Sequence, residues 1–579
     1  MLQPRLAPIL LALAAFVTSC RSTGGLPPIE GIRTASEARP SLLASATVAP
    51  LERISGDVDG LSRALGLPFT GKDLLTMLAA QQRLDATSSG NIDTARPIGL
   101  AVVAPAAKDQ EPLEALALSA RGADGATKLV SALGTTDERQ KGAQRITRPD
   151  GTVIWVATAG ATLFVSGSFE GLAVAGALAL EAQKPPSSDL VVTLFPDAFA
   201  RWQKTDVRTA LAAFRKEMID EQLVAAQRRG APVPGPAERL MYETALDLML
   251  DPLGDTLAGS FSLDLDAQKG IRVGLQFQPR PGSAFAKQIA APTPYAVDPA
   301  LLGAGSDPIA GVWAVGPSPF WMEVYDRVFQ AQARAGMRGA AEVSKRYQAL
   351  RPHLTGAGSG AVRMHGGAMT NDAVVALKGP PSTVALDAVT ALASSRGFVD
   401  LLSEIYGRAT PKVNVRRERD SLRTELAFPL QNRPGDPGTA LKAFFGSPTL
   451  TALTTVSGGR LLVATEPGAS ARLGALAAPR APAPPPELAA ALEETRGHDG
   501  FLYLDLWSLM KPAIPLAMKP REAQVFSLMT NMPGFSTLKL PMVMSYRGGP
   551  ALTAELRVPM SALTNAATVA RPFLGGARP

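Results

Sequence analysis

The chain of 579 residues contains a single cysteine, Cys20, and this limits how the folded protein can be stabilised. A disulfide needs two cysteines, and thiolate metal sites need more than one. The body must therefore depend on a hydrophobic core, and hydrophobic residues make up 46% of the chain. At this length we expect the core to be divided between two or more domains.

Cys20 also closes a short apolar stretch near the start of the chain. Arg5 carries a positive charge, Ile9–Val17 is apolar, and the small residues Thr18 and Ser19 precede the cysteine. This pattern resembles the lipobox of bacterial lipoprotein signal peptides. The resemblance implies that residues 1–19 are removed and that Cys20 is acylated. The alternatives are an ordinary secretory leader and a transmembrane anchor, for which the stretch is shorter than the ~20 residues needed.

By this resemblance the protein is lipid-anchored in the bacterial cell envelope, with the lipid as its membrane attachment. Arg21 follows the cysteine where lipoproteins retained at the inner membrane carry Asp, which favours the outer membrane. Lys and Arg total 58 against 51 for Asp and Glu, and no basic cluster is interleaved with aromatic residues. We therefore expect no nucleic-acid partner.

Breaker-rich segments divide the remainder of the chain. Residues 20–45 are rich in Ser, Gly, Pro and Ala and are predicted to form a flexible tether, and residues 479–486 a Pro-rich linker. The rest is predicted to form two α+β halves, residues 46–295 and 305–579.

Internal self-similarity is the main indication of the fold. Thr162–Ala179 aligns without gaps on Arg460–Ala477, and Leu116–Leu133 resembles Leu426–Phe444. A longer module opens with an apolar strand that leads into helices. It is predicted at Asp189–Trp202, Pro308–Val324 and Gly500–Ile514.

Each longer module is predicted to close with a hairpin and a helix, because apolar and polar residues alternate. The hairpins pair Phe261–Leu265 with Arg272–Phe277, Ala361–Met364 with Ala373–Leu377, and Met542–Tyr546 with Leu552–Arg557. We therefore predict an α+β fold of repeated strand–helix–hairpin–helix modules, with mostly antiparallel sheets backed by helices, in two similar halves. The alternative is three or four smaller domains. The architecture loosely resembles large exported bacterial repeat proteins of unknown function, and this implies no activity.

Two segments match binding motifs only in part. Gly66–Lys72 has the spacing of a phosphate-binding loop, but Asp73 stands where the motif needs Ser or Thr. We interpret it as a helix start with Asp73 as N-cap, and expect no nucleotide cofactor. Asp57–Gly60 matches only the opening of a calcium loop and is interpreted as a capped turn.

The titratable residues show no metal-binding spacing. His353, His365 and His498 are far apart, and each is predicted to lie in an exposed turn. Asp264 and Asp266 are two apart on a predicted strand and share one face, which indicates a solvent-facing row or, alternatively, an acid–base or cation site.

Four tryptophans lie near the predicted strand–helix junctions. We interpret them as core anchors, with a sugar-stacking platform as the alternative. They are Trp202, Trp313, Trp321 and Trp507.

The sequence thus shows no catalytic motif, metal site or cofactor motif. It favours a non-enzymatic, lipid-anchored protein that binds an envelope protein or glycan, with a groove between duplicated modules as the location. The alternative is an envelope hydrolase whose site is assembled from distant residues, such as His365 or the pair Asp264 and Asp266.

Overall fold

The computed structural model has two compact units, which we describe separately. Unit 1 comprises Met1–Ala212 and Leu253–Arg280, and unit 2 comprises Ala213–Pro252 and Pro281–Pro579. The structure describes residues 32–81, 86–106, 110–228, 239, 243, 252, 254–291, 293–304, 307–379, 383–405, 410–430, 437–477, 483–512, 514–517, 520–532, 534–535 and 538–574.

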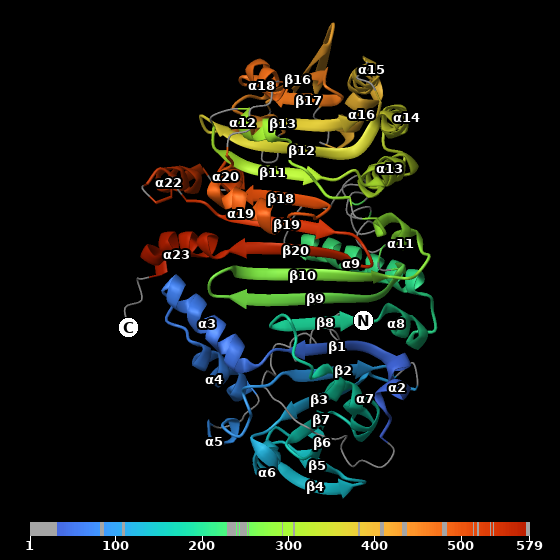
Figure 1. The fold of residues 1–579 in the computed structure, drawn as a ribbon, viewed down its shortest axis with the longest axis vertical. Coiled ribbons are helices and arrows are strands. Elements are labelled where there is room, and N and C mark those ends of the chain that lie inside the picture. Colours follow the sequence, from blue (N-terminus) through green and yellow to red (C-terminus); the bar gives the residue numbers. More distant parts are fainter. Residues whose placement is uncertain are drawn as a thin grey trace. The chain divides into compact units, whose positions relative to one another are not determined.

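The described residues of unit 1 form ten strands (Figure 1). They are β1 (Leu42–Val48), β2 (Ile98–Val103), β3 (Leu113–Ser119), β4 (Thr135–Gln140), β5 (Ala143–Thr147), β6 (Val153–Ala159), β7 (Thr162–Ser166), β8 (Leu190–Leu194), β9 (Thr256–Asp266) and β10 (Gly270–Pro279). Neighbouring strands are antiparallel, in the order β10-β9-β8-β1-β2-β3-β7-β6-β5-β4.

Helices cover both faces of this sheet. They are α2 (Ala35–Ala38), α3 (Leu51–Leu65), α4 (Gly71–Gln81), α5 (Ala86–Ser89), α6 (Gly122–Leu133), α7 (Phe169–Ala182) and α8 (Pro196–Trp202), while α9 (Val207–Arg228) continues from unit 1 into the residues of unit 2. Helix α7 packs on Ala101, whereas α3 packs on Ile98 and α8 on Val102. Since side chains alternate along a strand, α7 lies on one face and α3 and α8 on the other.

The described residues of unit 2 also form ten strands. They are β11 (Ile309–Val315), β12 (Leu354–His365), β13 (Ala368–Leu377), β14 (Lys412–Glu418), β15 (Ser421–Ala427), β16 (Thr449–Ser457), β17 (Arg460–Thr465), β18 (Gly500–Asp505), β19 (Pro541–Arg547) and β20 (Leu552–Pro559). They are antiparallel, in the order β20-β19-β18-β11-β12-β13-β17-β16-β15-β14.

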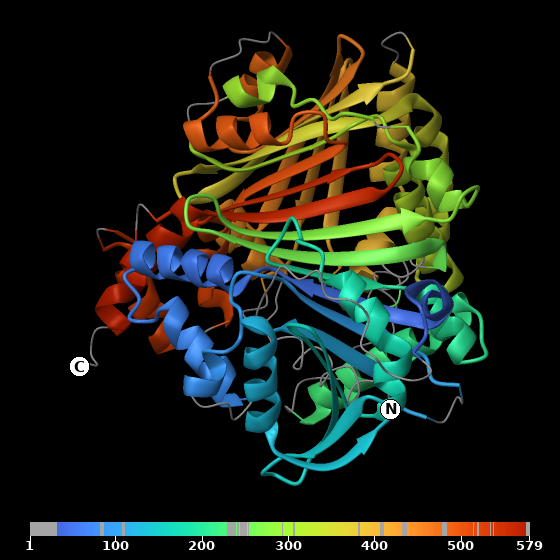
Figure 2. The ribbon, with the colours of Figure 1, turned by 60° about the horizontal axis from the view of Figure 1, so that its bottom comes forward.

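Helices cover both faces of the second sheet as well (Figure 2). They are α11 (Ala284–Ile289), α12 (Pro299–Gly303), α13 (Pro319–Arg334), α14 (Ala340–Leu350), α15 (Thr383–Ala393), α16 (Arg396–Ile405), α17 (Pro437–Phe445), α18 (Ala469–Ala477), α19 (Pro486–Glu494), α20 (Leu506–Met510), α21 (Ile514–Ala517), α22 (Pro520–Thr530) and α23 (Met560–Leu574). Helices α12, α18 and α19 pack on the face that carries Val374, and α15 on the face that carries Val375.

The strand order of unit 2 is that of unit 1 with ten added to each strand number. The register agrees in detail, since β1 has an irregularity between Leu42 and Ala44 in its pairing with β2, and β11 has one between Ile309 and Gly311 in its pairing with β12. Positions in the two units can therefore be compared one by one.

The structure confirms an α+β fold of antiparallel strands and the predicted hairpins β9–β10 and β19–β20. The hairpin β12–β13 also forms, but Ala361–Met364 pair with Met369–Asp372 and not with Ala373–Leu377 as predicted. The prediction that Leu116–Leu133 and Leu426–Phe444 are equivalent parts of a repeat was wrong. The first contains β3 and the second the end of β15, and these strands hold different places in the order. By contrast, Thr162–Ala179 and Arg460–Ala477 hold equivalent places, as β7–α7 and β17–α18.

The predicted tether, residues 20–45, was too long. Helix α2 and the first residues of β1 lie within it, and β1 pairs with both β2 and β8. The Ser- and Pro-rich surroundings of Leu42–Val48 concealed a strand in the middle of the sheet. Half of the predicted linker at 479–486 lies outside the described residues, and α19 begins at its last residue, Pro486.

Candidate functional site

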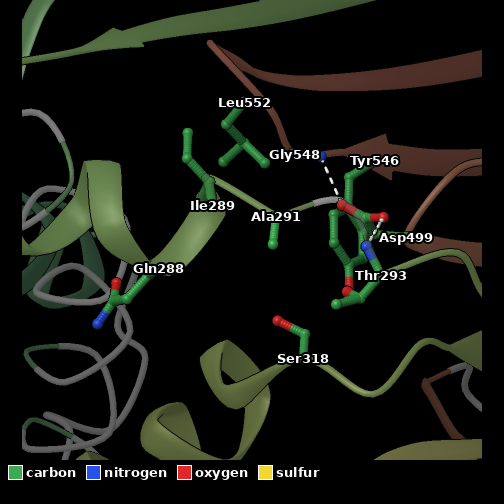
Figure 3. A pocket seen from close by; sticks show the side chains of 9 residues that line it. All are labelled: Gln288, Ile289, Ala291, Thr293, Ser318, Asp499, Tyr546, Gly548 and Leu552. Atoms are coloured by element: carbon green, nitrogen blue, oxygen red, sulfur yellow. Dashed lines mark hydrogen bonds between the residues drawn. The ribbon is translucent and has the colours of Figure 1, made fainter.

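A small pocket opens in unit 2 beside the start of β18 (Figure 3). It has about 310 Å³ of space not filled by atoms, part of it open to solvent. The enclosed part of this space, about 20 Å³, has room for a group the size of a water molecule. Its lining residues are Gln288, Ile289, Ala291, Thr293, Ser318, Asp499, Tyr546, Gly548 and Leu552.

Asp499 holds the walls of this pocket together. Its buried carboxylate accepts one hydrogen bond from the backbone N–H of Thr293 and one from that of Gly548, each at 2.6 Å (Figure 3). Its own N–H donates to the carbonyl oxygen of Tyr546 at 2.9 Å. A carboxylate in this position joins three chain segments.

The remaining polar groups of the pocket are hydroxyls and one amide. Figure 3 shows Ser318 and Gln288 on the side opposite Leu552. The Gln288 amide is engaged, because its Nε2 donates to Oε2 of Glu323 at 2.6 Å. The nine lining residues include no His, Cys or Lys, so the pocket offers hydrogen bonds to a small polar group rather than a nucleophile with its base.

Asp189 holds the equivalent place in unit 1, directly before β8. Its buried carboxylate accepts the N–H of Leu265 at 2.6 Å and lies 3.0 Å from Nε of Arg53. Arg53 also reaches Asp264 at 2.6 Å, and Asp264 pairs with Arg272 at 3.1 Å. We call Asp57, Asp189 and Asp264, with the two arginines, the acidic cluster.

Burial dominates the electrostatics of the acidic cluster. It raises the pKa of Asp189 to about 6, against the opposing effects of the Leu265 N–H and the Arg53 charge. Burial also raises the pKa of Asp57, and the charges of Asp266 and Asp264 add to the effect. A carboxylate with a raised pKa suits general acid–base chemistry, but two arginines occupy Asp264 here.

The predicted row of Asp264 and Asp266 serves two separate roles. Asp264 binds the two arginines, whereas Asp266 accepts the N–H groups of Gln268 and Lys269 at 2.8 and 2.9 Å and so stabilises the β9–β10 turn. These hydrogen bonds lower the pKa of Asp266. In the part of the chain that the structure describes, no group of three or more His, Cys, Asp or Glu side chains is arranged to hold a metal ion.

Of the three histidines, only His365 is exposed as predicted. Its Nδ1 lies 3.0 Å from Oδ2 of Asp307. His353 is half-buried in a short 3-10 helix, and His498 is half-buried before Asp499, so the prediction of exposed turns was wrong for both. Burial lowers the pKa of His498.

The partial motifs are helix structure. Thr70 and Asp73 form a capping box, in which Thr70 N donates to the Asp73 carboxylate at 2.7 Å and Asp73 N to Thr70 Oγ1 at 3.2 Å. The N-cap is therefore Thr70, and the prediction of Asp73 was wrong. Asp57–Gly60 lies within α3, so the predicted turn was also wrong, and α3 ends at Gly66 in the left-handed conformation.

The described tryptophans make the contacts of core anchors. Trp202 packs on Phe199 with ring centroids 5.6 Å apart, and Trp507 Nε1 donates to the carbonyl of Phe535 at 2.9 Å. Trp313 lies close to Gly358 and Gly360. The side chain of Trp321 lies outside the described part.

Sequence analysis did not find a buried ionic triad in unit 2, formed by Arg363, Asp372 and Arg472. Nε of Arg472 donates to Oδ1 of Asp372 at 2.9 Å, and Nε of Arg363 lies 3.8 Å from Oδ2. Burial raises the pKa of Asp372, although Arg472 opposes this, and burial lowers the pKa of Arg363. The only sequence signal was a charged residue at a core-facing position on each strand of the β12–β13 hairpin.

The donors of both arginines reach backbone carbonyls. Arg363 donates to the carbonyls of Asp307 and Leu301, and Arg472 to those of Pro467 and Thr465. A triad whose groups are buried and bonded in this way is suited to fixing the chain rather than to meeting a substrate.

Cys20 lies outside the described residues. Among those that are described, no helix combines the length and the apolar character needed to cross a membrane. No protein-family model, no curated protein and no solved structure matches the chain.

Proposed function

We propose that the chain is a lipid-anchored protein of the bacterial cell envelope, held at the outer membrane, whose body is a non-enzymatic binding or scaffold protein. The observation that carries the proposal is the lipobox-like sequence that ends at Cys20. Acyl chains on this residue would provide a stable anchor, because each buried methylene contributes about 0.8 kcal/mol.

A binding role for the body is supported by its buried carboxylates, because two of them are engaged in structural contacts. Asp499 is engaged by backbone N–H groups, and Asp372 by Arg472. The pocket beside Asp499 presents hydroxyls and an amide to a small polar group, as on a glycan or a protein loop. We therefore take an envelope protein or a glycan as the partner.

We further infer that the two units arose from one repeated unit, built from strand–helix–hairpin–helix modules. The shared strand order, the matching irregularities in β1 and β11, and the buried aspartates Asp189 and Asp499 support this inference. Each aspartate also accepts a backbone N–H from the end of the adjacent strand. Asp189 accepts that of Leu265 in β9, and Asp499 accepts that of Gly548, directly after β19.

A second candidate is a hydrolase that acts at the acidic cluster. The observation in its favour is the carboxyl of Asp189, whose pKa is raised to about 6. The arginine contacts of Asp264 weigh against it, because they neutralise the second carboxylate that the chemistry would need. Activity against peptides, esters or glycans that disappears in Asp189→Asn and persists in Asp499→Asn would favour this candidate over the binding role.

The anchor is tested by Cys20→Ser. The acylated wild-type protein is expected in the detergent phase after phase separation, and the variant in the aqueous phase, with its leader uncleaved or slowly processed. Fractionation of wild-type cells then reports which membrane holds the protein. A variant that is processed normally and remains membrane-bound would exclude lipidation at Cys20.

The binding role is tested by cross-linking in intact cells and purification of the wild-type chain. We expect one envelope component to be recovered reproducibly. The same experiment with Gln288→Ala, which shortens one wall of the pocket, should reduce its recovery. Repeated recovery of unrelated proteins alone would contradict the proposal.

A further inference from the structure

Helix α22 in unit 2 has large apolar side chains on two opposite sides. Its inner side packs against α20, where Phe526 meets Trp507 with ring centroids 6.2 Å apart, and Thr530 is buried. Its outer side carries Val525, Leu528 and, in the turn after the helix, Met532, which are 56%, 72% and 53% exposed. We call these three residues the α22 stripe.

The spacing of the α22 stripe is helical. Val525, Leu528 and Met532 follow one another by three and four residues, so they form one row along the helix. This row lies opposite the row of Phe526 and Thr530. A surface helix ordinarily presents polar residues on its outer side, and an exposed apolar row marks an interaction surface.

The neighbouring helix adds to this surface. Met510 at the end of α20 is 50% exposed. The next residue, Lys511, donates from Nζ to the carbonyl of Thr530 at 3.3 Å, which places the end of α20 beside the last turn of α22.

The charge around the stripe identifies the occupant. Among the described residues of the segment 506–540, the basic ones are Lys511, Arg521 and Lys539, and the acidic one is Glu522. Arg521 is exposed and precedes Val525 by four residues, so it lies in line with the stripe. An apolar row with basic residues at its margins is the pattern of helices that lie in the interface of an anionic bilayer.

We propose that α22 rests on the surface of an anionic lipid bilayer, with Val525, Leu528 and Met532 inserted among the headgroups and Arg521 at the level of the phosphates. The inference goes beyond the proposed function and depends on it only for the presence of a nearby membrane. It gives the body a second membrane contact besides the acyl anchor.

The test uses the single cysteine of the chain. Full-length Cys20→Ser has no thiol and no acyl anchor, so Leu528→Cys in this background provides one site for a polarity-sensitive fluorophore. Val384→Cys is the matched control, because Val384 is a 49% exposed apolar residue on another helix, α15. We expect a blue shift at position 528, and none at 384, with phosphatidylethanolamine–phosphatidylglycerol vesicles. Residues 1–19 are present in both variants, so any contribution from the leader is the same.

Two substitutions measure the affinity by vesicle flotation in the Cys20→Ser background. Leu528→Asp should lower the partition coefficient about tenfold or more, because an inserted apolar side chain is replaced by a charge. Arg521→Gln should lower it about fivefold on anionic vesicles and leave it unchanged on phosphatidylcholine. Val384→Asp should change neither value.

Equal responses at positions 528 and 384, or flotation that is unaffected by Leu528→Asp, would overturn the proposal. So would a dimer in light scattering that Leu528→Asp converts to a monomer, since the stripe would then be an interface between copies of the chain. Because no variant here is acylated, failure of the Cys20 anchor in cells would leave these results unaffected.

Discussion

The two units place different residues at the same core positions, in a part of the sheet that both build alike. Unit 2 has the triad Arg363, Asp372 and Arg472, and unit 1 has three apolar residues instead. Arg363 and Val103 pair with the first residues of β11 and β1, Asp372 and Ala115 pair with Ala361 and Ala101, and Arg472 and Val174 hold matching places in α18 and α7. All six residues are buried.

This difference shows that the fold does not require the ions. Placing three charges in a core costs desolvation energy, which their mutual attraction and the carbonyl contacts of the arginines offset. Unit 1 meets the same packing demand with Val103, Ala115 and Val174. The sheet therefore forms without such a triad. In unit 2 the triad joins the backbone carbonyls that its two arginines contact, those of Leu301 and Asp307 and those of Thr465 and Pro467.

The largest effect is expected where the triad is broken. Asp372→Ala leaves two buried guanidinium groups facing each other and should destabilise unit 2 by about 3–5 kcal/mol. The measurement is the urea-unfolding transition of the full chain. The triple variant Arg363→Val, Asp372→Ala, Arg472→Val copies unit 1 and should regain most of that stability. A triple variant less stable than Asp372→Ala would show that the triad is indispensable.

The second-largest effect is expected at the two buried aspartates, Asp189 before β8 and Asp499 before β18. Their replacement by Asn should cost different amounts of stability. Asp499→Asn replaces one accepting oxygen by an NH₂ group that faces a backbone N–H, from Thr293 or Gly548, and should cost about 1–3 kcal/mol. Asp189→Asn can keep the N–H contact from Leu265 and loses only the ion pair with the partly exposed Arg53, so it should cost less. Thermal unfolding of both variants measures the difference, and equal losses would mean that the two sites are equivalent.

A smaller effect is expected at a strand pair where the large and the small side chain stand on opposite strands in the two units. Trp313 pairs with Gly360 in unit 2, and Ala46 pairs with Leu100 at the same place in unit 1. A Cβ at Gly360 would lie 2.4 Å from Nε1 of Trp313, so Gly360→Ala should destabilise the protein by about 1–2 kcal/mol. Trp313→Ala removes the indole contact but leaves the carbonyl oxygen of Asp372 2.9 Å from that Cβ. Gly360→Ala should therefore shift the unfolding midpoint less in a Trp313→Ala background than in the wild-type protein. If the two shifts are equal, the backbone rather than the indole limits this site.

The last prediction concerns the pH dependence of stability at the acidic cluster. Burial raises the pKa of Asp189 from 3.8 to about 6, so the folded state binds its proton at a higher pH than the unfolded chain. The contribution of this group to stability therefore falls as the pH rises from about 4 to about 6. The melting temperature of Asp189→Asn should fall less over this window than that of the wild-type protein. Parallel pH profiles for the two proteins would contradict the assignment.

Sequence patterns predicted the parts of the fold that short segments determine. Alternation along Arg272–Phe277 and its two counterparts predicted three hairpins. The first four residues of β1, 42–45, were assigned to the tether, because a strand of seven residues without strong alternation indicates little by itself. Its pairing with β2 and β8 makes it a central strand.

The sites depended on contacts that no local pattern contains. Asp57 and Asp264 are 207 positions apart in sequence and meet through Arg53, on α3, and the β9–β10 hairpin. Asp499 joins separate chain segments only because those that carry Thr293 and Gly548 lie beside it in the fold. Residue types and spacing did not distinguish these aspartates from solvent-facing ones.

By itself the sequence determined that no disulfide forms within the chain, that its strands alternate and form hairpins, and that Cys20 closes a lipobox-like segment. Only the tertiary structure decided the order of the strands, the burial of Arg363 and Asp372, and the apolar outer side of α22. The physical reason is the separation along the chain over which each effect acts. Propensity and alternation act over a few residues, whereas strand pairing, desolvation and exposure depend on which distant segments fill the space around a side chain.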